Sequence, residues 1–436
     1  MTGLILLSVY IAIFAVSMVI VAWATKQFFT RADFTSLKTV TFGDESAVKA
    51  NRAASVISVL AIFALWVAFT NSSLPLFKAK GPFEGAVEFT YTSTLPDGRS
   101  DDATVSILVY PEDIQLTEDA DGASGKIPAA PEVDLGEGFA KNDSLVIPRY
   151  GSKLISVFQN DEFKKSDGAV VTHLNGQALT PGEQIILAEG RLALTEKGTP
   201  FFEPSSGFRM ARLYLPAPEV TTNRFLQLNR EGYRNFTLLE HTWASLQRVL
   251  LGFIFGALMG IPLGYAMGLT NWARGWFDPI VEFMRPVPPL ALIPLMIIWF
   301  GIGETSKVIL LFLAALWIMA IAARSGVSGV AIAKVHAAYS LGASKTQILG
   351  KVIIPNSLPE IFTGARVAMG VCWGTVVAAE LVAAEKGLGM MIMVAAKFQL
   401  TDIVIVGIIL IGVIGFAIDI GIRKLESWLV PWKGRV

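Results

Sequence analysis

Long apolar runs alternate with short polar stretches over much of this chain. Residues 3–23 and 249–269 contain no charged side chain, and about 20 helical residues cross ~30 Å of hydrocarbon at ~1.5 Å per residue. Weaker runs of the same kind are 53–70, 286–303, 308–323, 363–381 and 403–420. The pattern predicts an α-helical integral membrane protein with about seven transmembrane helices.

A polar block, residues 71–235, interrupts the apolar pattern. Apolar side chains alternate with polar ones in 86–91 and 104–110, as in half-buried strands. Residues 170–174 lead into Asn175-Gly176, a strong hairpin signal. We therefore expect two N-terminal helices with a connecting loop in 1–75, a small antiparallel β-rich domain in 76–235, and a membrane core in 236–436.

Basic residues predict the orientation of the helices, because cytoplasmic loops are enriched in Lys and Arg. Two residues precede the first apolar run, whereas the stretch between the first two runs contains Lys26, Arg31, Lys38, Lys49 and Arg52. This stretch is therefore expected in the cytoplasm, with the N-terminus and the β domain outside and the C-terminus inside. A cleaved signal peptide is the alternative interpretation of the first run, but the basic segment that should precede it is missing.

Composition narrows the function classes. The chain is 53% hydrophobic and 17% charged, with zero formal net charge, which fits a membrane protein. Its one cysteine, Cys372, has no partner for an internal disulfide. The sequence shows no His/Cys pattern with metal-ligand spacing and no basic cluster with interleaved aromatics, so we expect neither a metal site nor a nucleic-acid partner.

The polar stretch 336–355, HAAYSLGASKTQILGKVIIP, lies between two apolar runs. It resembles the EAA loop of ABC importer permeases, in which a small cytoplasmic helix docks into a groove of the ATPase. His336 stands where that family pattern has Glu, so a role for that acid does not carry over. The resemblance implies an ATPase-coupling loop formed by His336, Ala337, Ala338, Gly342, Ala343 and Pro355.

The runs 278–307 and 373–390, and the tail 431–434, are similar to taurine and aliphatic sulfonate permeases, which are grouped with nitrate, cyanate and bicarbonate permeases. The resemblance covers 240–436 well and 53–77 loosely. It implies a type I importer in a bacterial inner membrane: a homodimer of this permease, two cytoplasmic ATPases and a soluble periplasmic binding protein.

The sequence also indicates which subunit would hydrolyse ATP. It contains no G-x-x-x-x-G-K-[ST] segment to hold phosphates, so ATP and Mg²⁺ are expected on the partner ATPase, and the chain itself is expected to be neither an enzyme nor a cofactor-binding subunit. Outside transport, the alternative is a membrane-anchored sensor that binds a ligand with its β domain. Such a sensor needs an output module, and 14 residues follow Ile422.

Glu380 is an acid inside an apolar run, where an ionisable group is costly and often functional. It either takes part in gating or lies at a wet helix end and pairs with Lys386 or Lys307. Residues 387–391 are expected to form a re-entrant segment or a periplasmic gate, and no buried Arg or Lys is expected as an anion binder. The candidates for the translocation pathway or gate are Met296, Trp299, Trp373, Thr375, Glu380, Gly387 and Met390.

Overall fold

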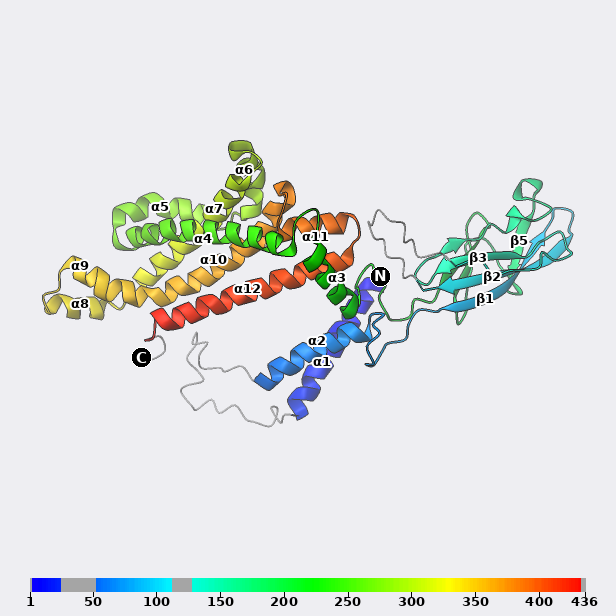
Figure 1. Ribbon diagram of the computed structural model, residues 1–436, viewed down its shortest axis with the longest axis horizontal. Coiled ribbons are helices and arrows are strands. Elements are labelled where there is room, and N and C mark those ends of the chain that lie inside the picture. Colours follow the sequence, from blue (N-terminus) through cyan, green and yellow to red (C-terminus); the bar gives the residue numbers. More distant parts are fainter. Residues whose placement is uncertain (1, 25–51, 112–127, 433–436) are drawn as a thin grey trace. The chain divides into compact units, whose positions relative to one another are not determined.

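The computed structural model describes residues 2–24, 52–111 and 128–432, which belong to two units. The first unit contains α1 (Thr2–Ala24), α2 (Arg52–Ala68) and the strands, and it ends at Pro218. The second begins at Glu219 and contains the remaining helices (Figure 1). This division differs from the predicted bounds, because the N-terminal helices group with the β domain. The basic stretch 26–49, used for the orientation, lies outside the described residues.

The β domain has two sheets. The order is β3-β2-β1-β5-β6 in one and β4-β9-β8-β7 in the other. The strands are β1 (Gly85–Thr94), β2 (Ser100–Tyr110), β3 (Asp143–Pro148), β4 (Lys153–Leu154), β5 (Val170–Leu174), β6 (Gln177–Ala178), β7 (Gln184–Ile186), β8 (Gly190–Leu194) and β9 (Pro200–Pro204).

Alternation along β1 and β2 places the side chains of Val87, Phe89, Val105 and Ile107 in one core, as predicted. Asn175-Gly176 forms the predicted hairpin turn, with φ of 51° and 74°. The expectation of a purely antiparallel domain was wrong, because β2 and β3 pair in parallel. Such a pair needs a long connection, and residues 111–142 separate the two strands in the sequence.

The second unit is helical. Its elements are α3 (Pro218–Glu231), α4 (Leu238–Leu269), α5 (Asn271–Met284), α6 (Ile293–Phe300), α7 (Glu304–Ser328), α8 (Ile332–Ser340), α9 (Lys345–Ile348), α10 (Ile354–Ala383), α11 (Leu388–Lys397) and α12 (Thr401–Leu429). The polar residues before the run 249–269 continue that run as one helix, α4. Thr237 and Glu240 begin it with a reciprocal capping box.

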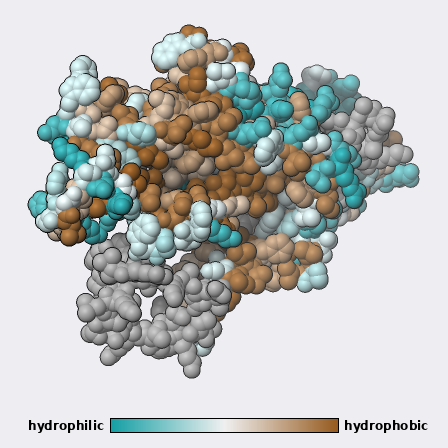
Figure 2. All heavy atoms as spheres, turned by 60° about the vertical axis from the view of Figure 1, so that its left-hand side comes forward, coloured by the Kyte–Doolittle hydropathy of each residue, from teal (hydrophilic) through white to brown (hydrophobic). Residues whose placement is uncertain are grey.

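Among the described residues, four helices are long and apolar enough to cross a membrane: α4, α7, α12 and the helix through 345–381. The α5–α6 pair forms a fifth candidate bent by 94°, and the prolines of 286–289 lie at its break, where they interrupt regular hydrogen bonding. Shorter apolar helices cover 11–20 and 55–68. Six of the seven predicted runs therefore coincide with single helices, and helical residues of the seventh, 286–303, are limited to 289–300. Figure 2 shows a broad hydrophobic surface.

Close packing of α4 on α7 forms the centre of the helical unit. Four glycines at every fourth position of α4 face α7; a Cβ on Gly252 would lie 2.3 Å from the Cβ of Leu311, and one on Gly264 would lie 2.4 Å from the carbonyl oxygen of Ala320. The other two are Gly256 and Gly260. Small residues at this spacing let two membrane helices approach closely, and this packing positions the polar residues at the start of α4.

Candidate functional site

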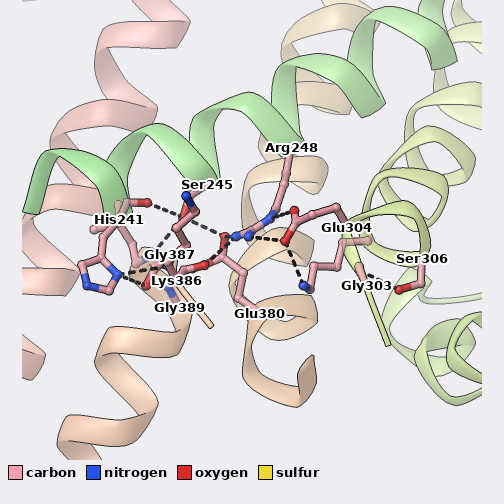
Figure 3. Close-up of polar contacts among 12 residues, drawn as sticks. His241, Ser245, Arg248, Gly303, Glu304, Ser306, Glu380, Lys386, Gly387 and Gly389 are labelled. Carbon is pink, nitrogen blue, oxygen red and sulfur yellow. Dashed lines mark hydrogen bonds and ion pairs between the residues drawn. The ribbon is translucent and has the colours of Figure 1, made fainter. Parts of the chain in front are cut away.

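A buried arginine connects three helices of the second unit (Figure 3). Arg248 of α4 donates from Nε and Nη2 to the two carboxylate oxygens of Glu304 in α7, at 2.5 and 2.7 Å. Its Nη1 donates to Glu380 Oε1 of α10 at 2.6 Å and to the carbonyl of Lys386 at 2.9 Å. The side chains of Arg248 and Glu380 are 3% and 0% exposed. The fork geometry makes this a strong, directional contact.

The same face of α4 holds the segment between α10 and α11 with two further side chains. Ser245 donates to Glu380 Oε1 at 2.8 Å and accepts from the Leu388 amide at 2.9 Å. His241 Nδ1 accepts from the Gly387 amide at 3.0 Å, so its proton is on Nε2, 3.0 Å from the Tyr233 carbonyl. Positions 241, 245 and 248 lie on one helical face. We call these side chains, with Glu304, Glu380 and Lys307, the Arg248 network.

The charges of the Arg248 network balance. Lys307 Nζ lies 3.2 Å from Glu304 Oε1, and its side chain is 4% exposed. Arg248 and Lys307 thus offset Glu304 and Glu380, and the Gly389 amide donates to Glu380 Oε2 at 2.8 Å. These pairs and hydrogen bonds offset the desolvation cost of the buried Arg248, Lys307 and Glu380, whereas the Glu304 side chain is 62% exposed.

One expectation about this region was wrong. Glu380 pairs with Arg248, not with Lys386 or Lys307: Lys386 contributes its carbonyl, and its ammonium lies over the Phe236 ring. The structure also contains two buried cations, Arg248 and Lys307, and both pair with carboxylates. The burial of Arg248 was not predicted, because in the sequence Arg248 is the last residue of a polar stretch. In the structure it is buried because the glycines of α4 let that helix pack closely against α7.

Of the predicted pathway or gate residues, the structure brings Glu380 and Gly387 into this hydrogen-bonded cluster. Met296 lines a small hollow shared with Lys307 and Ala379. Trp299 is exposed, whereas Thr375 and Met390 are buried. Trp373 packs in the core beside Val249 and Leu311, and its indole donates to the Ile411 carbonyl at 3.0 Å.

The predicted coupling loop forms α8, a turn and α9, and then continues into α10. Every residue of α8 is exposed or half-buried, and Leu341 in the turn is 88% exposed. His336 and Ala337 are exposed, while Ala338, Ala343 and Pro355 are half-buried.

Gly342 lies in the turn after α8 and ends that helix. Its φ is +82°, and none of the described atoms lies within 4 Å of a Cβ built on it. Its amide donates to the Tyr339 carbonyl at 2.9 Å and so closes α8. A glycine is required here because its backbone is left-handed, as at many helix C-termini.

The β domain contains a second polar cluster. Asp161 accepts from the Lys141 amide at 2.7 Å and from the Tyr91 hydroxyl at 3.1 Å. Burial raises the pKa of Asp161, and burial together with the nearby Asp161 raises the pKa of Asp143 to about 7. Oδ2 of Asp143 is buried without a hydrogen-bond partner in the described part of the chain. No three His, Cys, Asp or Glu side chains among the described residues group as a metal site.

Comparison with known proteins places this fold in a family. The model of the binding-protein-dependent transport system inner membrane component matches residues 252–430. The taurine transport system permease protein TauC of Escherichia coli K12 is 48% identical over 225 residues, which are 51% of this chain and 82% of that protein. The bicarbonate transport system permease protein CmpB of Synechococcus elongatus is 33% identical over 194 residues, 44% of this chain and 70% of the relative.

Among solved structures, the inward-facing MetNI methionine ABC transporter aligns with a TM-score of 0.40 at 19% identity, over 47% of this chain and 98% of the other. The family model covers the helical unit from residue 252 within α4 to residue 430, a range that includes the coupling loop and Glu304, Lys307 and Glu380 of the Arg248 network. This chain belongs to the inner membrane components of binding-protein-dependent transport systems, the permease subunits of ABC importers.

Proposed function

We propose that this permease imports taurine or related aliphatic sulfonates. The observation that carries the proposal is the 48% identity to the taurine permease of Escherichia coli over 82% of that protein's length. In the proposed importer two copies of the chain form the pathway, two cytoplasmic ATPases bind ATP and Mg²⁺, and a periplasmic binding protein delivers the solute.

A permease for bicarbonate, nitrate or cyanate is the second candidate, and the bicarbonate permease among the relatives favours it. In both candidates the solute is small and carries a negatively charged group. The two candidates differ in the solute that is imported. The bicarbonate permease is less similar to this chain than the taurine permease is, so it supports the second candidate less strongly.

For coupling, we propose that α8 and the turn after it dock into the ATPase. Burying an exposed apolar side chain against a partner contributes about 1.5–3 kcal/mol to the binding free energy. Leu341 is such an exposed side chain, at the turn that Gly342 forms directly after it. His336, Ala337 and Ala338 would form the adjoining face of α8.

The Arg248 network is proposed to hold the gate segment rather than to bind solute. Both cations already pair with carboxylates, so the acidic group of a solute would have to compete with a carboxylate for either of them. Glu380 and Gly387 would then act in gating. The residues around the hollow beside Met296 and Lys307 are proposed to line the translocation pathway. Further proposed pathway or gate residues are Trp299, Trp373, Thr375 and Met390.

The test is uptake by proteoliposomes that contain the full-length permease with an ATPase subunit and a periplasmic binding protein from the same organism. We expect saturable, ATP-dependent uptake of radiolabelled taurine that ethanesulfonate inhibits and nitrate and bicarbonate do not. An ATPase subunit unable to hydrolyse ATP is the control. Uptake of bicarbonate or nitrate in place of taurine would favour the second candidate.

A further inference from the structure

Two segments of the first unit surround the last turn of α2. After the helix ends, the chain loops back so that the Ala79 amide donates to the Ala68 carbonyl at 2.9 Å. From the other end of the β domain, the Met210 amide donates to the Phe69 carbonyl at 2.8 Å. The Trp66 indole donates to the Pro216 carbonyl at 2.9 Å. We call residues 74–80 and 206–215 the collar.

The collar exposes large apolar side chains. Phe77 and Tyr214 are 80% and 74% exposed, and Leu76, Phe208 and Leu213 are exposed as well. The turn that carries Leu213 and Tyr214 lies between Met210 and Pro216, both bonded to the end of α2, so these side chains lie next to that end. Exposed Val59 and Leu60 continue the apolar surface along α2 itself.

Basic side chains accompany this apolar surface. Lys78 and Lys80 are exposed in the collar, and Arg209 fixes the loop by donating to the Ala79 carbonyl at 2.7 Å. Aromatic rings and lysines beside the end of an apolar helix are the combination found where membrane helices leave the hydrocarbon. There the rings enter the headgroup region, and the ammonium groups reach lipid phosphates.

We propose that the short apolar helix α2 enters the bilayer and that the collar is a lipid-binding surface that immerses Phe77 and Tyr214 in the interface beside it. An exposed apolar patch of this kind needs a partner, and its continuity with α2 identifies that partner as lipid. Each buried ring adds membrane affinity, and each lysine contributes about 1 kcal/mol near an anionic surface.

The collar is joined rigidly to the β domain, so lipid contact would fix how the domain stands on the membrane. The Phe83 amide donates to the Ser205 carbonyl, and the Phe208 amide donates to that of Lys80, each at 2.8 Å. We call the part of the chain joined by these two hydrogen bonds the neck of the β domain. After the neck, β1 extends for ten residues, about 30 Å at ~3.3 Å per residue. Val170 pairs with Thr94 at the far end of β1 and is 51% exposed, so it should stay in water.

Depth-dependent quenching in nanodiscs tests the proposal on the full-length protein. In a Cys372→Ala background, the variants Phe77→Cys, Tyr214→Cys and, as the matched control, Val170→Cys are labelled with an environment-sensitive fluorophore. Lipids brominated near the headgroup end of the acyl chain should quench the labels at 77 and 214 several-fold more strongly than the label at 170.

Two outcomes would overturn the proposal. One is equal quenching at all three positions. The other is a blue-shifted emission at 77 and 214 without quenching by brominated lipid, which would place protein rather than lipid over the collar. Because positions 77 and 214 lie in separate segments and are labelled in separate variants, misfolding of one variant leaves the other as the test.

Discussion

At the scale of single residues, the pairing of Glu380 with Arg248 gives a direct prediction. Glu380→Ala leaves Arg248 with one carboxylate and removes the acceptor of the Gly389 amide. Breaking a buried pair in this way should lower the free energy of unfolding by about 3 kcal/mol, measured on the full-length chain in detergent. Glu380→Gln keeps an acceptor and should cost less.

The control for this prediction is Asp419→Ala. Asp419 pairs with Arg423 at 2.8 Å, but the two side chains are 31% and 62% exposed, and exposed pairs contribute at most about 1 kcal/mol. If Asp419→Ala and Glu380→Ala destabilise the protein equally, the Arg248 network is not the buried, coupled unit that the structure shows.

The sequence identified Glu380 but not its partner. An acid inside an apolar run can be recognised from the sequence alone, because the free-energy cost of burying it follows from the apolar residues next to it. Arg248 lies 132 positions earlier, at the border between a polar stretch and an apolar run. Its burial depends on how α4 packs on α7 and α10, which no local pattern determines.

Asp143 gives a prediction about pH. Its pKa is raised to about 7 in the folded β domain, from an ordinary value of 3.8. The folded state therefore binds more protons than the unfolded state between these values, so the contribution of Asp143 to stability is complete below about pH 4 and is lost as the pH rises through about 7. Asp143→Asn should stabilise the domain at pH 8 by about 1–2 kcal/mol, after discounting for partial exposure.

Hydrogen exchange of peptides from β1 and β2, corrected for the intrinsic rates, measures this effect at pH 5 and pH 8. The wild-type protein should lose protection as the pH rises, and Asp143→Asn should show a smaller loss. A wild-type β domain that is more protected at pH 8 than at pH 5 would contradict the raised pKa.

At the scale of elements, the coupling loop gives a prediction about docking. Leu341→Asp should reduce solute uptake and co-purification of the ATPase by about tenfold or more, the effect of losing roughly 1.4 kcal/mol of docking free energy. Val170→Asp, an exposed apolar residue changed in the same way within the β domain, is the control and should leave co-purification unchanged. Full co-purification of Leu341→Asp would remove the turn from the proposed interface.

Most elements could be predicted from hydrophobic periodicity, and the exceptions have physical causes. Six of the seven runs coincide with single helices because their length and polarity are local properties. The parallel pairing of β2 and β3 was missed because alternation marks a strand without giving its direction. The glycines at positions 252, 256, 260 and 264 were a readable signal for close helix packing, and they would have indicated that α4 packs against another helix.

At the scale of the whole molecule, the inserted domain can be removed at a defined place. Its neck brings Lys80 and Phe208 within hydrogen-bond distance, so a short linker can join these ends. The cut must spare α3, because Arg224 lies 3.3 Å from Asp402 of α12 and Leu228 packs in the core with Leu388 and Met391. A deletion that reached Arg224 would damage the helical unit itself.

The inserted domain is predicted to assist delivery by the binding protein. The family match begins at residue 252 and does not include the domain, so translocation should not require it. Replacing residues 81–207 with a short Gly/Ser linker should therefore preserve basal ATP hydrolysis by the assembled importer. It should lower uptake several-fold when the binding protein is limiting and have little effect when the binding protein is in excess, because weaker docking is overcome by mass action. Unchanged uptake at limiting binding protein would show that the domain does not assist delivery, and loss of ATPase assembly would indicate a structural role for it.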